Sequence, residues 1–517
     1  QRTLEATIAW SYDLLSAAEG RAFARLSVFA GGWTLTAAEE VCDADLDICQ
    51  SLVDKSLVRA EAGRFRMLET IREYAVQRSE EAGWSTELRP RHASYFAELA
   101  KRAEPELTGP DQQMWLETLA PEHDNMRLAL EWFAETPGEG HAGLRMATNL
   151  VFFWWVRGLF RDGLHWLEGM LALSGEEDPG ARAGALWGAG VLWAVLGDED
   201  QARPLIDESL AIAQRLGDES RIARALDVLG LLAFFRNDLP EAVELLEESI
   251  DLARRAGDAF CLADALGTVG SIYPLIGAFE RSAVAGSEGL AVAREAGDRQ
   301  GIRMSLLGLA LAAARLGDLQ SSRRSAEEGL AICRDLGDPF FLAYFLWILA
   351  TVATDSGHLN EARAWAEEGL AVAREVEAPL LQVCALEAVS AVFQAEGDHD
   401  SAGQHLAEAV EIGRRGMVPG SYVSSALCAL GEVSATRGDL EDAKRTLEES
   451  LSMARDVKIP GRSRGHSAES RPSRDRRGSR LAREGSRWRR WASSWRSAMS
   501  SAARSRSAIS PQWRPMR

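Results

Sequence analysis

The chain has 517 residues, 46% of them hydrophobic, and a formal net charge of −19 at pH 7. It is too long for one globular core unless that core grows in one dimension, as in repeat proteins. Its acidic balance argues against a nucleic-acid groove along the body of the chain, because phosphates repel such a surface. No run of about 20 apolar residues is present, so no membrane span is predicted. Six scattered cysteines show neither zinc spacing nor a disulfide framework, and we expect buried thiols in a cytoplasmic protein.

Residues 1–84 indicate several short helices, a hairpin and one more helix. The apolar spacing predicts helices over Arg2–Leu15, from Ser16 to about Phe29, over Thr36–Cys42 and over Ile48–Ser56. Leu57–Ala60 and Arg64–Met67 alternate on either side of a three-residue turn, as the strands of a β-hairpin do. Three or four helices with such a hairpin make a winged helix.

Winged helices commonly bind DNA, but the helix before this hairpin and its approach carry four acidic residues: Asp43, Asp45, Asp47 and Asp54. Only Lys55 opposes them, and phosphates would be repelled. We therefore expect this domain to pack against other parts of the protein instead of binding nucleic acid.

Residues 85–137 form a predicted helical bridge. Helices are expected over Leu88–Glu104 and Gln112–Leu119, followed by a third that opens at Glu122-His123-Asp124-Asn125. Neighbouring helical residues point about 100° apart, so Glu122, His123 and Asp124 cannot converge on one metal ion. We expect these residues to cap the helix.

Residues 138–457 form the predicted repeat region, and from Gly197 to Asp439 a turn signal recurs about every twenty residues. Its positions are Gly197, Gly217, Asn237, Gly257, Gly277, Gly297, Gly317, Gly337, Gly357 and Gly397, most of them followed by Asp. Glu377 stands at a degraded position, and Gly438-Asp439 comes one residue late. Glycine ends helices in the left-handed conformation, and the following Asp can cap the next helix. The pattern predicts 40-residue helix pairs, the signature of a solenoid.

The residues between the turns agree with helix pairs. First helices carry a bulky residue before a small one, as at Leu229-Gly230, and second helices repeat a small residue at Ala242 and its 40-residue equivalents. The mid-unit turns fall at Gly158, Gly197, Asn237, Gly277, Gly317, Gly357, Gly397 and Gly438. The predicted fold is all-α: an α-solenoid of about eight 40-residue helix pairs, preceded by a small winged-helix domain with one β-hairpin.

The first helix of every unit is expected to line the concave side of the solenoid. Counting positions along these helices gives the candidate binding residues Phe152, Trp155, Trp187, Val191, Arg224, Asp227, Leu231, Phe234, Tyr344 and Trp347. Exposed aromatic residues in a groove commonly anchor a partner, whereas the same residues could instead be core contacts between curved units. The set favours a groove in the first three units.

Residues 458–517 differ from the rest, with 17 Lys and Arg against 3 Asp and Glu and no apolar periodicity. We expect this tail to be disordered. Its Arg, Ser and Trp could bind RNA or DNA, but the abrupt change of composition favours a frameshifted segment.

The repeats and the N-terminal segment resemble known families. The Leu-Gly and Ala spacing resembles the tetratricopeptide repeat, although with 40 residues in place of 34. The longer unit is similar to repeats in the sensor arms of large bacterial transcriptional regulators. Thr7–Leu15, Leu26–Phe29, Leu52–Leu57 and Met67–Ala75 resemble the winged helix that closes the NB-ARC region of STAND-type signalling ATPases in actinobacteria.

The resemblance implies roles for two short motifs. Met67-Leu68-Glu69 aligns with the family's Met-His-Asp motif, whose His approaches bound ADP, but Leu68 cannot hydrogen-bond a phosphate. Glu122–Asn125 is similar to the stretch that opens the repeat region in the same regulators.

As a whole, the resemblance implies the sensor part of a LuxR-family-type transcriptional regulator. It would bind a protein or small-molecule effector on its repeats. The intact protein would bind ATP or ADP in an NB-ARC domain that we expect upstream of Gln1. The alternative is a free-standing scaffold for protein–protein interactions. No phosphate-binding loop and no Ser/His/Asp or Cys/His set appears, so no catalytic, cofactor or metal residue is predicted in this chain.

Overall fold

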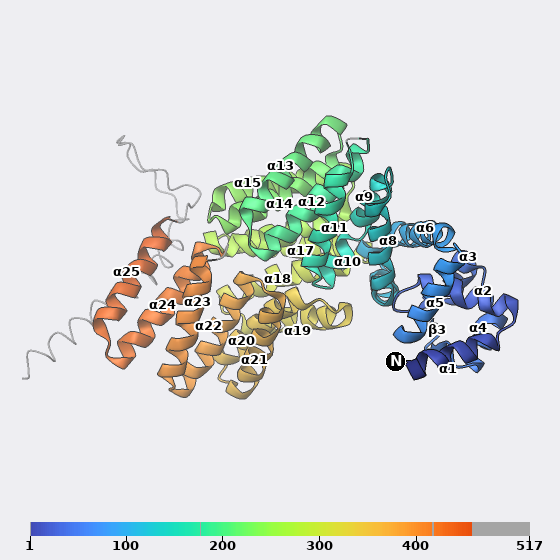
Figure 1. Cartoon of the computed structure of the whole chain (residues 1–517). Helices are drawn as coiled ribbons and strands as arrows, with labels where there is room; N and C mark the ends of the chain where they lie inside the picture. The colour runs from blue at the N-terminus through green and yellow to red at the C-terminus, as the bar shows by residue number, and fades with distance from the viewer. Residues whose placement is uncertain (1, 176, 416–417, 457–517) are drawn as a thin grey trace, which may run out of the picture. The chain divides into compact units, whose positions relative to one another are not determined.

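The structure, a computed structural model, describes residues 2–175, 177–415 and 418–456 (Figure 1). The expectations for the 458–517 tail therefore lie outside the described residues. The N-terminal elements are α1 (Arg2–Asp13), α2 (Ala17–Arg25), η1 (Leu26–Val28), β1 (Trp33–Thr34), α3 (Leu35–Cys42), α4 (Leu46–Asp54), β2 (Arg59–Glu61), β3 (Arg64–Arg66) and α5 (Glu69–Glu81). Ser16 and Glu19 form a reciprocal capping box at the start of α2, which explains why the chain restarts a helix there.

A small antiparallel sheet lies among these helices, in the order β1-β3-β2. The predicted hairpin is present, and its turn consists of Ala62 and Gly63, both with positive φ. The strand β1 was not predicted. It pairs Trp33 with Phe65, and this approach needs the glycine at position 32, because a Cβ there would lie 2.6 Å from the Phe65 carbonyl oxygen.

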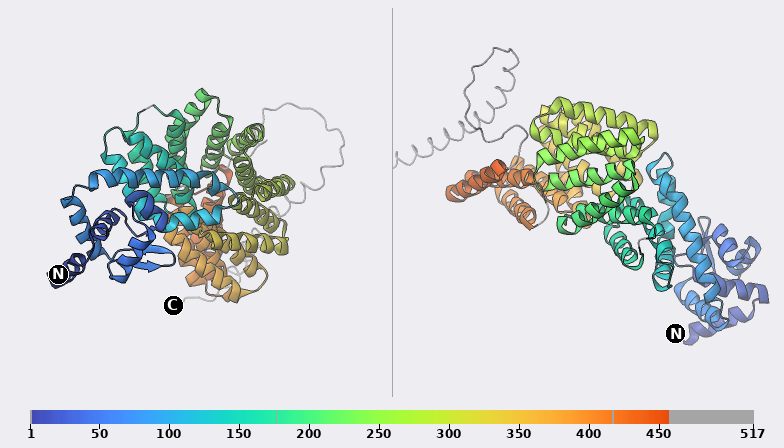
Figure 2. Two further views of the ribbon diagram at one scale, coloured as in Figure 1. Left: turned by 90° about the vertical axis from the view of Figure 1, so that its right-hand side faces the viewer. Right: turned by 90° about the horizontal axis from the view of Figure 1, so that it is seen from above.

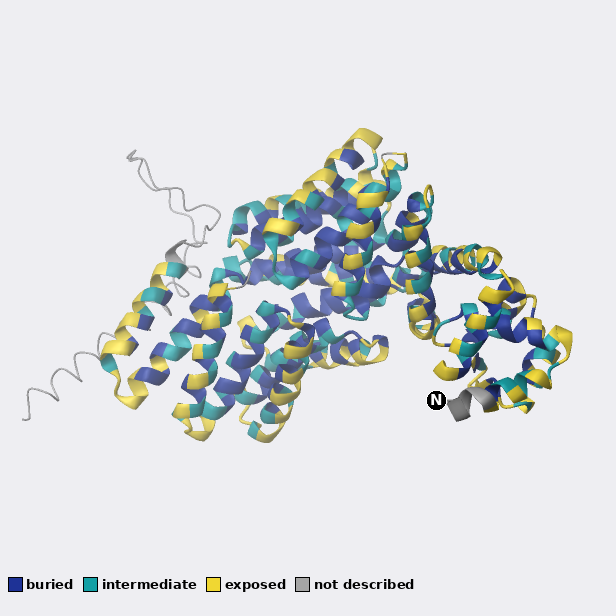
Figure 3. Ribbon diagram, in the orientation of Figure 1, coloured by how far each residue is buried: buried dark blue, intermediate teal, exposed yellow. Residues whose placement is uncertain are grey.

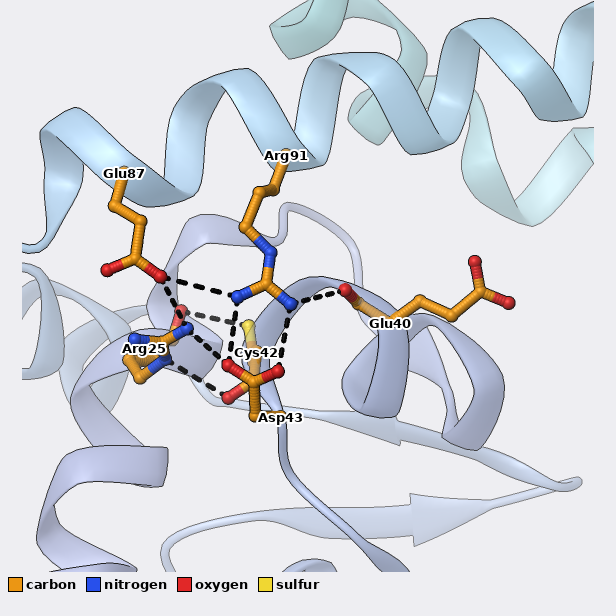
Figure 4. A network of polar contacts seen from close by, with 6 residues as sticks. All are labelled: Arg25, Glu40, Cys42, Asp43, Glu87 and Arg91. Atoms are coloured by element: carbon orange, nitrogen blue, oxygen red, sulfur yellow. Dashed lines mark hydrogen bonds and ion pairs between the residues drawn. The ribbon is translucent and has the colours of Figure 1, made fainter.

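The bridge comprises α6 (Ser85–Ala103), η2 (Glu104–Thr108), α7 (Gln112–Leu119), η3 (Ala120–Glu122) and α8 (His123–Glu135). A polar network ties α6 to α2 and α3 (Figure 4). In it Arg91 donates to both carboxylate oxygens of Asp43, at 2.8 and 2.9 Å, and Arg25 donates to the same carboxylate at 2.7 Å. The hydrogen bonds from Arg91 hold the pKa of Asp43 below its usual range. Two arginines therefore neutralise Asp43, one of the four acids from which we expected this domain not to bind DNA.

Asn125 of α8 is a second tie between the bridge and the N-terminal elements. Its side chain is fully buried, accepts from the Ala30 amide at 2.8 Å, and donates to the Gly32 carbonyl oxygen at 2.8 Å and to Glu122 at 2.7 Å. His92 of α6 lies 3.3 Å from the same Asn125 oxygen. The expectation that this motif caps α8 is wrong, because Glu122 makes no side-chain cap. Instead Glu122 pairs with Arg64 and Asn125 bonds to Gly32, both in the N-terminal elements, while His123 lies 3.3 Å from Asp162 of the repeats.

The repeat helices follow one another as antiparallel pairs (Figure 1). They are α9 (Gly140–Asn149), α10 (Val151–Val156), α11 (Phe160–Leu173), α12 (Pro179–Leu196), α13 (Glu199–Leu216), α14 (Glu219–Phe235), α15 (Leu239–Ala256), α16 (Ala259–Ile272), η4 (Tyr273–Ile276), α17 (Phe279–Ala296), α18 (Arg299–Leu316), α19 (Leu319–Leu336), α20 (Pro339–Asp355), α21 (Leu359–Val376), α22 (Pro379–Glu396), α23 (His399–Arg415), α24 (Gly420–Arg437) and α25 (Leu440–Asp456). The prediction of an all-α solenoid with a small N-terminal sheet is confirmed.

The turns between these helices have the predicted conformation. The glycines at the twenty-residue positions have positive φ, and so do the two residues that replace them, Asn237 at +66° and Glu377 at +59°. The Asp after the turn caps the next helix, for example at Asp218, which accepts from the Arg221 amide at 3.0 Å. Backbone geometry is therefore retained even where the sequence signal degrades.

Small residues let the two helices of a pair approach closely. A Cβ at Gly230 would lie 2.7 Å from a carbon of Leu246, and one at Gly431 would lie 2.6 Å from a carbon of Leu447. Ser282 occupies a predicted small position and donates to the Gly270 carbonyl oxygen across its pair at 2.6 Å. The segment Ala259–Ile276 is long and apolar enough to cross a membrane by length and composition, but 72% of it is buried among neighbouring helices, as in a core helix.

The repeats also contact one another across about 180 to 220 residues of sequence. Gly158 packs on Pro339, Arg161 pairs with Glu377 at 2.7 Å, and Asn237 packs on Gly420. We call this line of contacts the seam. It joins mid-unit turns to the turns that begin α20, α22 and α24, and the left view of Figure 2 shows the repeats following one another around a ring. The sequence did not predict the seam.

The bridge also contacts the repeats, at the turn before α18. Pro110 packs against Gly297, and Arg299 donates to Gln113 at 2.6 Å. Asp298 caps α18 beside this contact and is buried, as is Asp338, the equivalent cap forty residues on. The bridge therefore lies on the N-terminal elements at one end and on the start of α18 at the other.

Candidate functional site: the inner face of the repeats

The first helices of the units bring predicted aromatic residues together at the N-terminal end of the repeats. The Phe152 ring lies 6.0 Å from Trp155, 5.6 Å from Trp187 and 4.9 Å from Phe260, measured between ring centroids. Trp187 donates its indole N–H to the Arg224 carbonyl oxygen at 3.1 Å. Phe152 is 4% exposed and Trp155 is 9% exposed, so these rings pack against one another in the core.

Two arginines on the inner helices are paired with the caps of helices that follow. Arg224 of α14 donates to Asp258 at 3.0 Å, and its guanidinium lies 5.4 Å from the Phe260 ring centroid. Arg303 of α18 forms an ion pair with Asp338, and both side chains are buried. Because a buried charge is costly without a partner, each cap neutralises an arginine that the inner face would otherwise leave uncompensated.

A second aromatic group forms where the seam closes. Tyr422 of α24 lies 6.4 Å from Phe234 and 6.1 Å from Trp347, and Trp347 lies 6.3 Å from Tyr344. The predicted residues Phe234, Tyr344 and Trp347 are thus gathered by a residue that the sequence did not single out. Burial raises the pKa of Tyr344 and of Tyr422.

Two carboxylic acids meet on the inner face. Asp227 of α14 was a candidate binding residue, and the structure places it beside Asp264 of α16. The two are 8% and 9% exposed. Burial, together with the charge of Asp264, raises the pKa of Asp227 well above its ordinary value, and burial raises that of Asp264 to about 6. Such a pair is more stable when one carboxyl keeps its proton than when both carboxyls are ionised.

The two remaining candidates lie in the core or at its edge. Val191 is buried, and Leu231 is half-buried. Figure 3 shows that buried positions run along the first helices of the units, where most of the candidates lie. The side chains are therefore mostly in contact with other inner helices, since the seam brings distant units together.

Sequence reasoning missed Phe260, Asp264, Gln300, Arg303 and Tyr422. One signal was available for Asp264, because it stands forty residues after Arg224 in an otherwise apolar helix. A lone acid at an inner position in such a helix indicates a partner or a function, because acidic side chains are rarely buried without one. Tyr422 could not be found by counting, because its contacts depend on the seam.

The N-terminal motif residues lie apart from the inner face. Leu68 is the residue before α5 and is 40% exposed, while Glu69 pairs with Arg72 at 3.2 Å. Met67 is half-buried. In the part of the chain that the structure describes, no group of three or more His, Cys, Asp or Glu side chains is arranged to hold a metal ion.

Comparison with known proteins places the repeats in a known class. Tetratricopeptide repeat models match residues 183–255, 381–456 and 343–368, and the model of anaphase-promoting complex subunit 5 matches residues 293–355. A Mycobacterium tuberculosis protein named "Putative HTH-type transcriptional regulator" is 33% identical over 255 residues, covering 44% of this chain and 28% of that protein. The chain thus spans well under half the length of this curated relative.

Two solved structures are similar. A Rap protein complexed with competence and sporulation factor has a TM-score of 0.53 and 11% identity, covering 71% of this chain and 99% of that one. A Signal Transduction ATPase with Numerous Domains (STAND) protein with a tetratricopeptide repeat sensor, from Pyrococcus horikoshii, has a TM-score of 0.39 and 17% identity, covering 78% of this chain and 64% of that one. The second score is too low to carry an argument. The matches, with the helix pairs described above, identify the chain as one that contains tetratricopeptide repeats, arranged as an α-solenoid behind a small three-stranded sheet.

Proposed function

We propose that this chain is the sensor portion of a STAND-type regulator of transcription. In this proposal an effector binds the inner face of the repeats, at the predicted residues from Phe152 to Trp347. The bridge passes the event to the N-terminal elements, which we propose to be the winged helix of an NB-ARC region. The relative named as a transcriptional regulator and the sequence resemblance support this reading.

The observation that carries the proposal is the double attachment of the bridge. Asn125 and Arg91 hold it to the N-terminal elements, while Pro110 and Gln113 contact the start of α18. A change in the curvature of the repeats would move one end of the bridge relative to the other. Coupling between two sites needs such an element, one whose position both sites can influence.

The alternative is a free-standing scaffold, which the repeats alone would suffice to make. The match of residues 293–355 to a subunit of a large complex favours it, and repeat solenoids commonly present binding surfaces. A scaffold has no need of a bridge held at both ends, so the regulator is the proposal that explains more of the structure.

The experiment is to express the protein from the start codon of its gene and to measure ATP and ADP binding by calorimetry beside the 517-residue chain. We expect the longer protein to bind nucleotide and the 517-residue chain not to. Asn125→Ala in the longer protein should change the rate of ADP release, because it loosens the bridge from the N-terminal elements. A gene with no phosphate-binding loop before Gln1, or nucleotide binding by the shorter chain, would contradict the proposal.

A further inference from the structure

Among the described residues, Asp227 and Asp264 form no direct ion pair, although the charges of Arg303 and Arg224 act on Asp264. Each has one carboxylate oxygen that is buried without a hydrogen-bond partner. Every other acid so far placed on the inner face has a match, since Asp258 pairs with Arg224 and Asp338 pairs with Arg303. The inner face thus carries an acidic surplus at one point.

Other unpartnered polar atoms surround that point, and they come from α18. Gln300 is fully buried and lies beside Asp264 without meeting hydrogen-bond geometry, so that both atoms of its amide group lack a partner. Arg303 uses one nitrogen on Asp338, its Nε and second Nη have no hydrogen-bond partner, and its guanidinium lies 4.3 Å from the Phe341 ring centroid. Buried polar groups in folded proteins are nearly always satisfied, so a cluster of unsatisfied donors and acceptors indicates a missing polar occupant.

The charges select the kind of occupant. An anion would face two acids, whereas a cation would meet both and would leave Gln300 and Arg303 to bond polar atoms next to its charge. Phe260, which precedes Asp264 by one helical turn, already has the Arg224 guanidinium 5.4 Å from its ring centroid. Aromatic rings beside carboxylates are a common setting for a desolvated cation.

We propose that Asp227 and Asp264 bind the ammonium or guanidinium group of a ligand, with Gln300 and Arg303 contacting the polar atoms beside it. This rests on the proposed function, because it specifies the effector that the inner face receives. The source is either a small amine or a basic side chain of a peptide. Since both acids are less than a tenth exposed, binding requires the helices around them to move apart.

Proton release is a consequence of such binding. In the closed face the raised pKa values of Asp227 and Asp264 keep a proton on the pair, and an arriving cation displaces it. The other charged or titratable groups facing the pair are Arg224 and Cys261 on α14 and α16, Asp258 before α16, and Asp298 and Arg303 at α18. Arg224 and Arg303 are paired and stay charged, so affinity should rise between about pH 5 and pH 8 as the acids ionise.

The test is calorimetry with the whole 517-residue chain and two cationic probes, agmatine and the end-blocked tripeptide Ala-Arg-Ala. The neutral control is the same tripeptide with citrulline in place of Arg. We expect a cationic probe to bind and the citrulline peptide not to, with affinity about tenfold weaker or more in Asp227→Asn and Asp264→Asn. Asp200→Asn, on the exposed side of α13, should bind as the unaltered chain does.

Asn fits the space of Asp, and circular dichroism melts would establish that both variants fold. Binding of agmatine alone would identify a free amine, and binding of the tripeptide a basic side chain. Absence of binding by both probes at millimolar concentration would overturn the inference, as would equal affinity in all variants. If cations bind but the longer protein shows no nucleotide-dependent change, the proposed regulator fails while this site stands.

Discussion

Replacing Asn125 with alanine should separate the bridge from the N-terminal elements. The change removes an accepted hydrogen bond from the Ala30 amide and donated bonds to Gly32 and Glu122. Neutral hydrogen bonds contribute about 1 kcal/mol each and those to charged groups about 1.5–3 kcal/mol, so the expected cost is about 3–5 kcal/mol. Most of that cost arises because buried partners are left unsatisfied.

The assay is hydrogen exchange followed by mass spectrometry on the 517-residue chain. Peptides that cover Ala30–Gly32, α6 near His92 and α8 should lose about a hundredfold or more of their protection, while α20–α23 should be unchanged. Asn360→Ala is the matched control, because Asn360 is an exposed residue of α21 and gains the same helix propensity. Equal protection in Asn125→Ala and Asn360→Ala would refute the reasoning that this side chain holds the bridge in place.

Three further predictions use matched changes. Gly329→Ala should lower the free energy of unfolding by about 1–3 kcal/mol, because its Cβ would lie 2.2 Å from the Phe345 ring. Gly169→Ala, with open space around it, should raise that free energy by about 0.5–1 kcal/mol; both are measured by urea unfolding. Burial lowers the pKa of His92 to about 4. The stability that neutral His92 contributes is therefore present above pH 6.5 and is lost as the pH falls through 4. His92→Gln should remove about 3 kcal/mol of that pH dependence in unfolding titrations. Burial raises the pKa of Asp264 to about 6. Folding stability is therefore lost as the pH rises from about 4 through 6. In the same titrations Asp264→Asn should stabilise the chain by about 3 kcal/mol at pH 7 but not at pH 4.

The repeat architecture could be predicted from the sequence because its signals are local. A glycine followed by an Asp determines the end of one helix and the start of the next within two residues, independently of contacts with distant parts of the chain. Even Glu377, where the glycine is missing, takes the left-handed conformation with a φ of +59°. The hairpin around Gly63 was predictable for the same local reason.

The inner face could not be predicted, because it depends on how curvature adds up over several units. A small rotation from each helix pair decides whether Gly158 meets Pro339 or stays free, and no single residue specifies that rotation. Counting positions therefore found Phe152 and Trp155 on inner helices but not their burial. The role of Glu122 was missed for a related reason, since a capping motif and a tertiary contact use the same residue types.

The seam also changes how a core mutation should spread. Leu246→Ala removes a buried side chain that packs over Gly230 and should cost about 2–5 kcal/mol. In a purely one-dimensional solenoid only α14–α16 would loosen. Here Phe234, in the same apolar cluster, contacts Tyr422, so the start of α24 should loosen as well, about 180 residues away, while α18 and α19 between them keep their protection.

Leu447→Ala is the reciprocal test, because Leu447 packs over Gly431 as Leu246 packs over Gly230, and its helix pair carries the other side of the seam at Gly420 and Tyr422. It should loosen α24 and α25 and, through the same seam contact, the end of α14 near Phe234. Hydrogen exchange on both variants distinguishes the two pictures. If the first variant leaves α24 as protected as the unaltered chain does, the seam does not couple the two ends of the repeats, and the one-dimensional description holds.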